Sequence, residues 1–211
     1  MNYSIVFQND DFYIVDKGPF VESFEIADDI NNDYDVDRNG LVHRLDKDTS
    51  GLMIFAKNNN SLIDLQKLFK SRIINKSYYG LVWGKIESKG IIELNIARDP
   101  KRKKPMKVVS YQSQSTRGVV RFSKTSWKVN KYYNFKNNTL SLVEFKIFTG
   151  RTHQIRLTAH YLHHPIIGDK IYYFKDSRKF SETIKAERQF LHCYNIEFIY
   201  KEIKYNFTSE L

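Results

Sequence analysis

Short β-rich runs separated by turn residues are the feature that most constrains the fold of this chain. Residues 4–7 and 12–15 flank the turn Asn9-Asp10-Asp11, a pattern that predicts a β-hairpin. Other runs are filled with apolar residues or partly alternate apolar with polar ones, as buried and half-buried strands do. They lie at residues 52–56, 118–122 and 140–147.

Residues 77–83 and 90–96 predict a second strand pair, whereas only two segments have the period of a helix. One is the set Leu62, Leu65, Leu68 and Phe69, which follows a plausible N-cap at Asn60-Ser61; the other is Ile155, Ala159 and Leu162, ended by Pro165. The acidic stretch 21–39 has little periodicity and is expected to form a loop or a mobile segment. The fold class predicted is therefore α+β, a mainly antiparallel mixed sheet with a few flanking helices.

Length and composition limit the architecture further. A chain of 211 residues fits one domain, expected to span residues 1–211, and a monomer is the default expectation. The longest apolar runs have four or five residues, far fewer than the roughly 18 of a membrane-spanning helix, and the N-terminus has no secretory pattern. A single cysteine, Cys193, excludes a disulfide framework and a cysteine-based metal site. We expect a cytoplasmic protein.

Charge is distributed unevenly along the chain. Residues 1–37 hold ten acidic residues and one basic residue, whereas residues 38–211 hold 33 basic and 14 acidic residues. A body with a net charge of +19 attracts polyanions, and nucleic acid is the leading partner on this evidence. The alternative is a merely soluble basic surface.

The segment most suggestive of chemistry is residues 41–57, LVHRLDKDTSGLMIFAK. A basic residue, Arg44, lies two positions before a carboxylate, Asp46, and a Thr-Ser-Gly turn then leads into an apolar strand. The turn would direct Asp46 to the edge of a sheet, where loops carry function. The alternative is a surface ion pair of Arg44 with Asp46 beside a turn.

The stretch HRLDKDTSGL at residues 43–52 resembles the signature of RNA pseudouridine synthases of the RluA type. Five shorter stretches resemble that family in the same order, and the resemblance covers about residues 4–198. They are IVFQNDDFYIVDK at 5–17, KSY at 76–78, TGRTHQIR at 149–156, HPIIGD at 164–169 and LHC at 191–193. The resemblance implies the pseudouridine synthase fold and isomerisation of uridine in structured RNA, either ribosomal or transfer RNA.

The resemblance also implies roles for three catalytic residues. Asp46 matches the catalytic aspartate, and Arg151 matches the arginine that pairs with it, keeps it charged and holds its orientation. Tyr78 matches the tyrosine that stacks on the flipped base, with its hydroxyl near C5. Core packing is the alternative for Tyr78, and a structural or phosphate-binding role is the alternative for Arg151. The reaction is redox-neutral and loses no heavy atom, so we expect neither a cofactor nor a metal.

Substrate-binding roles follow from the same resemblance. Arg44 matches the residue suited to fill the space that the flipped uridine leaves, and Leu45 lies between it and the catalytic aspartate. Ile155 and Leu191 would form apolar walls of the pocket, or ordinary core. A basic cluster is expected to contact phosphates, with a solvated loop as the alternative. The cluster consists of Lys101, Arg102, Lys103, Lys104 and Lys107, and Arg98 lies just before it.

Three other interpretations fit the sequence less well than this one. A non-catalytic RNA-binding module would be expected to lack Asp46, Tyr78 or Arg151, and all three are present. A hydrolase using Asp46 with His43 lacks a nucleophile elbow and a second carboxylate in a comparable motif. The histidines at 160, 163 and 164 are weak evidence for a metal. The chain begins at the catalytic hairpin, so we expect no N-terminal S4 RNA-binding domain.

Overall fold

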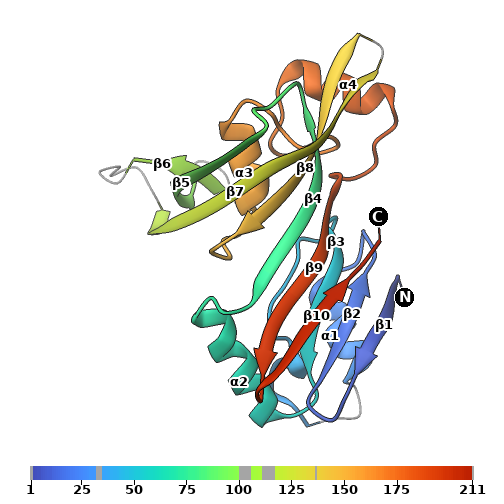
Figure 1. The fold of residues 1–211 in the computed structure, drawn as a ribbon, viewed down its shortest axis with the longest axis vertical. Coiled ribbons are helices and arrows are strands. Elements are labelled where there is room, and N and C mark those ends of the chain that lie inside the picture. The colour runs from blue at the N-terminus through green and yellow to red at the C-terminus, as the bar shows by residue number, and fades with distance from the viewer. Residues whose placement is uncertain (1, 32–34, 100–105, 111–116, 136, 211) are drawn as a thin grey trace. The chain divides into compact units, whose positions relative to one another are not determined.

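The short strands expected from the sequence are present, and the chain divides between two structural units (Figure 1). The computed structural model describes residues 2–31, 35–99, 106–110, 117–135 and 137–210. Unit 1 comprises Met1–Ser77 and His192–Leu211, and unit 2 comprises Tyr78–Leu191. Unit 2 is therefore inserted, in sequence, between the two parts of unit 1.

Unit 1 is built on a sheet in which β2 and β3 carry the core. Its strands follow the order β1-β2-β3-β9, and β10 pairs with β9. The pairs are antiparallel except for β3 with β9, which run parallel. Every residue of β3 is buried, and an aromatic cluster that includes Phe12 and Phe198 packs beside it. The bounds are β1 Tyr3–Gln8, β2 Phe12–Lys17, β3 Ser50–Ala56, β9 Leu191–Tyr200 and β10 Ile203–Thr208.

The expectation that residues 21–39 form a loop is wrong. They contain the helix α1, Ser23–Ile30, and the 3₁₀ helix η1, Asp37–Gly40. Ile26 and Ala27 of α1 are fully buried, and the Glu25 side chain accepts a hydrogen bond of 3.1 Å from the backbone N–H of Glu22. A carboxylate in the first turn also interacts favourably with the helix dipole. The helix has too few turns for its apolar period to be visible among so many acidic residues.

The helix predicted around Leu62 is α2, Asn59–Lys70, and its N-cap differs from the expected one. Asn58 is the cap, since its side-chain oxygen accepts a hydrogen bond of 2.9 Å from the backbone N–H of Ser61. Leu62 and Leu65 are buried, as the periodicity predicts.

Unit 2 contains a second set of strands, which follow the order β4-β8-β7-β5-β6. The expected pairing of residues 77–83 with 90–96 is wrong, because β8 neighbours β4 and the long strand β7 pairs with β5. The pairs β5–β6, β5–β7 and β7–β8 are all antiparallel. The bounds are β4 Asn75–Trp83, β5 Lys89–Arg98, β6 Met106–Val109, β7 Arg117–Phe135 and β8 Asn138–Ile147.

Two helices, α3 (Gln154–Tyr161) and α4 (Lys175–Thr183), complete unit 2. The sequence predicts α3, and six consecutive residues of it are buried. Leu157 of α3 packs with Ile96 and Tyr172 in one apolar cluster, whereas Phe180 of α4 packs in another.

The predicted fold class is confirmed: the chain is α+β, with mainly antiparallel strands and a few helices. Across the residues that the structure describes, no helix has both the length and the apolar character needed to cross a membrane.

Candidate active site

The loop between η1 and β3, residues 41–49, carries the candidate catalytic carboxylate of unit 1. Leu45 is buried, whereas its neighbours Arg44 and Asp46 are exposed and half-buried. The backbone N–H of Thr49 donates to the carbonyl of Asp46 at 3.0 Å, which closes a turn. Leu45 thus anchors the loop, and the polar side chains on either side of it remain accessible.

Ser23 of α1 fixes the centre of this loop. Its hydroxyl accepts a hydrogen bond from the backbone N–H of Leu45 and donates one to the carbonyl of the same residue, both at 3.1 Å. The helix that the sequence did not reveal therefore satisfies both backbone groups of the residue that precedes Asp46.

Lys17 fixes the residue that follows Asp46. Its side chain is fully buried, and the ammonium group donates to the carbonyls of Gly18, Val21 and Lys47 at 2.8–2.9 Å. An ammonium group has three N–H donors, so these three acceptors match its capacity. The Lys17 ammonium group thus links the end of β2, the turn after it and the Asp46 loop by hydrogen bonds.

The loop ends in a close contact between β3 and β9. Gly51 has φ +112°, and a Cβ atom there would lie 2.3 Å from the carbonyl oxygen of Cys193, so only glycine fits. Ser50 Oγ lies 2.9 Å from His192 Nδ1, and His192 Nε2 lies 3.0 Å from Ser209 Oγ. Ser209 also donates to the carboxylate of Asp16. Side chains from β2, β3, β9 and the C-terminal segment thereby fix the start of β3.

His43, at the start of the motif, has a structural environment. Its Nε2 atom accepts a hydrogen bond of 3.0 Å from the backbone N–H of Ile54, so the proton of the neutral ring is on Nδ1. The ring stacks on Phe69 with centroids 4.4 Å apart, and Lys76 Nζ lies 5.0 Å from the same Phe69 ring. Burial lowers the pKa of His43 well below its ordinary value, and the charge of Lys76 lowers it further. A neutral ring with Nε2 occupied cannot act as a general base.

The remaining candidate residues, both catalytic and substrate-binding, belong to unit 2. Tyr78 and Leu191 are the residues at which the chain enters and leaves that unit, and both are buried. Ile155 is buried in α3, and Arg98 is exposed at the end of β5. Lys101, Arg102, Lys103 and Lys104 lie outside the described residues.

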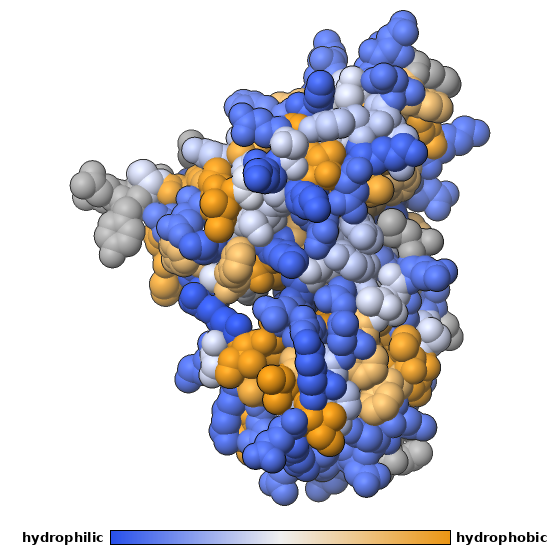
Figure 2. All heavy atoms as spheres, viewed as in Figure 1, coloured by the Kyte–Doolittle hydropathy of each residue, from blue (hydrophilic) through white to orange (hydrophobic). Residues whose placement is uncertain are grey.

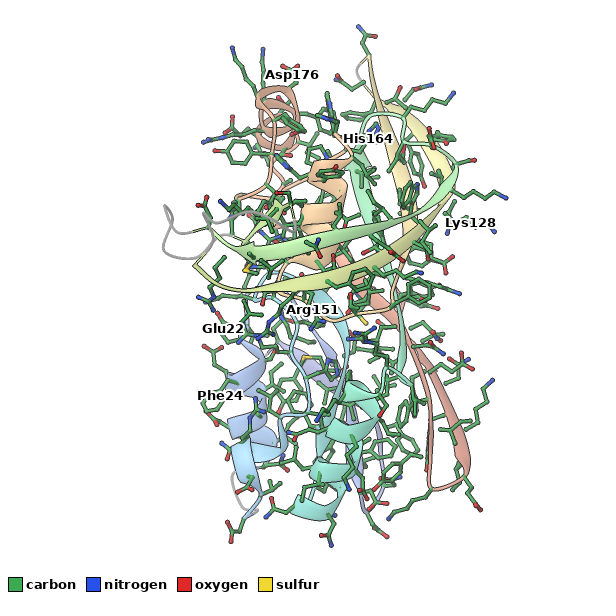
Figure 3. The ribbon with its side chains drawn as sticks, turned by 90° about the vertical axis from the view of Figure 1, so that its left-hand side faces the viewer. Glu22, Phe24, Lys128, Arg151, His164 and Asp176 are labelled. Carbon is green, nitrogen blue, oxygen red and sulfur yellow. The ribbon has the colours of Figure 1, made fainter. Side chains whose placement is uncertain are left out.

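Arg151 lies in a turn that is held against β7 (Figure 3). Gln154 anchors this turn, since its Nε2 donates to the carbonyl of Lys124 and to Thr125 Oγ1, both at 3.0 Å. Its Oε1 accepts from the backbone N–H of Arg151 at 3.1 Å. The half-buried side chain of Arg151 donates from Nε to the carbonyl of Phe122 at 2.9 Å. The guanidinium group is therefore held by β7.

Arg156 has a structural role. It forms a buried two-point ion pair with Asp169, with N–O distances of 2.7 and 2.9 Å. His164 Nδ1 lies 2.7 Å from the carbonyl of Trp83. Within the described ranges, no group of three or more His, Cys, Asp or Glu residues is arranged to hold a metal ion.

The two units differ in charge. Unit 2 carries 23 Lys and Arg against eight Asp and Glu, a net charge of +15. Unit 1 carries 11 basic and 16 acidic residues, a net charge of −5. Hydrophilic residues cover much of the face drawn in Figure 2, and apolar residues gather between them in patches. The polyanion-attracting charge expected from the sequence is therefore concentrated in unit 2.

Comparison with known proteins connects these observations. The model of a family described as RNA pseudouridylate synthase matches residues 11–161, which include the Asp46 loop and the Arg151 turn. The chain belongs to this family. Its match runs through parts of both units, and it includes the anchoring residues Lys17, Ser23 and Gln154.

Relatives in this family are identical to the chain at somewhat more than a third of the aligned positions. The ribosomal large subunit pseudouridine synthase D of Buchnera aphidicola subsp. Schizaphis graminum is 35% identical over 173 residues, 78% of this chain and 51% of the relative. The dual-specificity RNA pseudouridine synthase RluA of Vibrio vulnificus is 38% identical over 158 residues, 72% of this chain and 60% of the relative. The chain thus spans between one half and three fifths of these relatives.

Among solved structures, human RNA Pseudouridylate Synthase Domain Containing 1 superposes with a TM-score of 0.80 at 26% identity. The superposition covers 100% of this chain and 84% of the human chain. The likeness to this family therefore includes the fold of the whole chain.

Sequence reasoning identified the motif residues that resemble this family but missed the residues that hold them. Lys17, Ser23 and His192 are separated from their partners by 30, 22 and 142 positions. A lysine at the end of a strand that begins with four buried residues was the one available signal, because a buried lysine needs acceptors nearby.

Proposed function

We propose that this protein isomerises uridine in RNA to pseudouridine, with Asp46 as the catalytic carboxylate. The N1–C1′ bond breaks, C1′ bonds to C5 of the same base, the proton on C5 leaves, and N1 takes up a proton, so the product is an isomer of the substrate. No atom other than that exchanged proton is lost, so the reaction needs neither a metal nor a redox cofactor. An ionised Asp46 begins the reaction at C6, at C1′ or at the 2′ position.

The observation that supports this role is the way in which the Asp46 loop is held. Lys17 and Ser23 bond to the backbone of the loop, and the His43 side chain bonds to the backbone of Ile54 in β3, so that residues 43, 45 and 47 are anchored. A preorganised carboxylate does not have to be ordered when the substrate binds, which lowers the barrier to reaction. A chain that only bound RNA would gain nothing from holding the backbone around one acidic residue so firmly.

We propose that Tyr78 and Arg151 act on the same uridine as Asp46, so that units 1 and 2 form a single catalytic domain. Tyr78 stacks on the flipped base and assists proton loss from C5, and Arg151 keeps Asp46 ionised and oriented. Arg44 occupies the space that the uridine leaves, and Leu45, Ile155 and Leu191 form apolar walls.

The RNA partner follows from charge and from relatives. Unit 2 has a net charge of +15, which suits a phosphate backbone, and Arg98 and residues 101–104 supply phosphate contacts. One relative is named for the ribosomal large subunit and another as dual-specificity, so we propose ribosomal or transfer RNA as the substrate. We further propose a monomer that acts in the cytoplasm.

Two other functions are less well supported than isomerisation. A hydrolase that uses His43 as its base is disfavoured, because His43 Nε2 already accepts a backbone hydrogen bond. A non-catalytic RNA-binding module has no use for an acidic residue whose backbone is held on both sides, and only an activity measurement separates it from an enzyme.

Tritium release from RNA labelled at C5 of uridine tests the proposal. Isomerisation releases the label, whereas RNA binding or hydrolysis retains it. Asp46→Asn is nearly isosteric and should abolish release, whereas Asp48→Asn, in the same loop, should retain most of it. Release that persists in folded Asp46→Asn protein would exclude Asp46 as the catalytic group.

A further inference from the structure

A cavity of about 430 Å³ lies within unit 2, apart from the residues assigned to the chemistry. Its wall combines α3, β6 and the segment after Asp169, and its volume is in the range of roughly 300–1,000 Å³ that small-molecule sites occupy. The described residues that line it are Asp99, Met106, Lys107, Val108, Leu157, His160, Tyr161, Ile171, Tyr172 and Tyr173. Tyr78, Arg151, Ile155 and Leu191 are not among them.

The floor of this cavity is apolar and rigid. Leu157 and Tyr172 are buried in one cluster, and Met106 packs against it. The Tyr172 hydroxyl accepts from the backbone N–H of Met106 at 2.9 Å and lies 3.1 Å from the carbonyl of the same residue. It also lies 3.0 Å from His153 Nδ1. The aromatic wall is therefore fixed in place before any ligand arrives.

The rim presents aromatic faces to solvent. Tyr161 is 50% exposed and Phe174, beside the cavity, is 36% exposed. The His160 ring stacks on Phe174 with centroids 4.6 Å apart and an interplanar angle of 15°. Burial lowers the pKa of His160, which favours the neutral imidazole; its N–H bonds to the backbone of Tyr173, and its other ring nitrogen is an acceptor. Flat exposed rings beside a neutral hydrogen-bonding ring suit the face and edge of a nucleobase.

Charge favours a nucleotide over an apolar peptide as the occupant. Lys107 lines the cavity, and Lys170, next to the lining residue Ile171, is exposed. The cavity belongs to the unit whose net charge is +15. Asp99, also at the wall, suits the exocyclic amino group of a base. Aromatic faces combined with positive charge are the recurring means by which proteins hold unpaired RNA.

We propose that this cavity is a second nucleotide subsite, which takes an unpaired RNA base other than the target uridine. It presupposes that the protein acts on RNA, and it adds a contact that fixes where the substrate lies. The base enters against Tyr172 and stacks beside Tyr161 and His160, while its phosphate lies near Lys107.

Binding of RNA to Asp46→Asn protein tests the subsite without turnover. The probe is a fluorescein-labelled, mixed-sequence, single-stranded RNA dodecamer, measured by fluorescence anisotropy. Tyr161→Ala and His160→Gln should each raise the Kd roughly five- to 150-fold, the effect of removing one base stack. Tyr133→Ala is the matched control, because Tyr133 is an exposed aromatic residue of unit 2 that does not line the cavity.

Nucleoside monophosphates supply a second readout. Titration of the four ribonucleoside 5′-monophosphates into the full chain should shift the NMR signals of the His160 ring, and Tyr161→Ala should reduce the shift. Unchanged dodecamer affinity in both variants, together with an unmoved His160 signal, would overturn the subsite. So would displacement of bound dodecamer by an apolar peptide alone, since that would assign the cavity to a protein partner. Neither result depends on tritium release, so failure of the subsite and failure of the enzymatic activity remain distinguishable.

Discussion

The hydroxyl of Ser23 bridges the backbone N–H and the carbonyl of Leu45, with both distances 3.1 Å. One small side chain on α1 thus satisfies both peptide groups of the residue that precedes Asp46. Leu45 is buried, so without Ser23 these groups would have no ready access to water. The bridge fixes the backbone immediately before Asp46 without using the Asp46 carboxylate.

Ser23→Ala should therefore lower both stability and turnover. Two buried backbone groups lose their partner, which we expect to cost about 1–3 kcal/mol in the free energy of unfolding. Release of tritium at saturating RNA should fall several-fold, while RNA affinity changes little. Ser4→Ala, an exposed serine of the same unit, is the control. Wild-type turnover in Ser23→Ala would show that the loop is held without this bridge.

Lys17→Met should destabilise the protein more strongly than any exposed lysine substitution. The change leaves the carbonyls of Gly18, Val21 and Lys47 without the ammonium donor, and we expect a loss of roughly 3 kcal/mol in the free energy of unfolding. Denaturant unfolding measures it. Lys70→Met, at the exposed end of α2, should stay within about 0.5 kcal/mol of wild type. Equal stability of the two variants would argue against the role assigned to Lys17.

Local periodicity explains which elements the sequence could predict. The elements β2, β3, α2 and α3 each bury two or more apolar residues within one short window. By contrast, α4 buries only Ser177 and Phe180, too few residues for its period to be recognised. Helix α1 was missed for a similar reason.

Long-range pairing explains what the sequence could not predict. The division into two units depends on the return of the chain at His192, where β9 pairs in parallel with β3 about 140 positions earlier. The motif residues could be found by resemblance because they are contiguous. The Lys17 and Ser23 anchors could not, because a hydrogen bond between distant positions leaves no local pattern.

His43 makes the protein sensitive to acid. In the unfolded chain its imidazole takes up a proton as the pH falls through about 6.5, whereas burial prevents this in the folded protein. The unfolded state then binds more protons than the folded state. The free energy of unfolding therefore decreases as the pH is lowered, by at most about 1.4 kcal/mol per pH unit for this group. His43→Gln should show a shallower loss of unfolding free energy between pH 7.5 and 5.5. An identical pH dependence in both proteins would mean that His43 titrates normally in the fold.

Replacing all four residues at 101–104 by alanine should weaken RNA binding and make the Kd less dependent on salt concentration. If three or four of these side chains meet phosphates, the log–log slope becomes less negative by about 2–4, at roughly 0.7–0.9 per contact. Turnover at saturating RNA should change little, because phosphate contacts position the RNA without touching the reacting base. The control replaces Lys67, Lys70, Arg72 and Lys204, which are exposed on the acidic unit 1 and should leave the slope unchanged. A slope that stays at its wild-type value in the 101–104 variant would mean that these side chains do not contact RNA phosphates.

Tyr78→Phe separates stacking from proton transfer. The ring that would stack on the flipped base remains, so RNA affinity should stay within about twofold of wild type. The hydroxyl that would assist proton loss from C5 is removed, and turnover should fall by roughly 10²–10⁴-fold, the usual contribution of a general acid–base group. Tyr79→Phe is the control, because successive side chains of a strand point to opposite faces, and Tyr78 is buried whereas Tyr79 is half-buried. Single-turnover tritium release and anisotropy measure the two quantities separately. Equal losses of turnover in the two variants, accompanied by equal losses of stability, would assign Tyr78 to packing in β4.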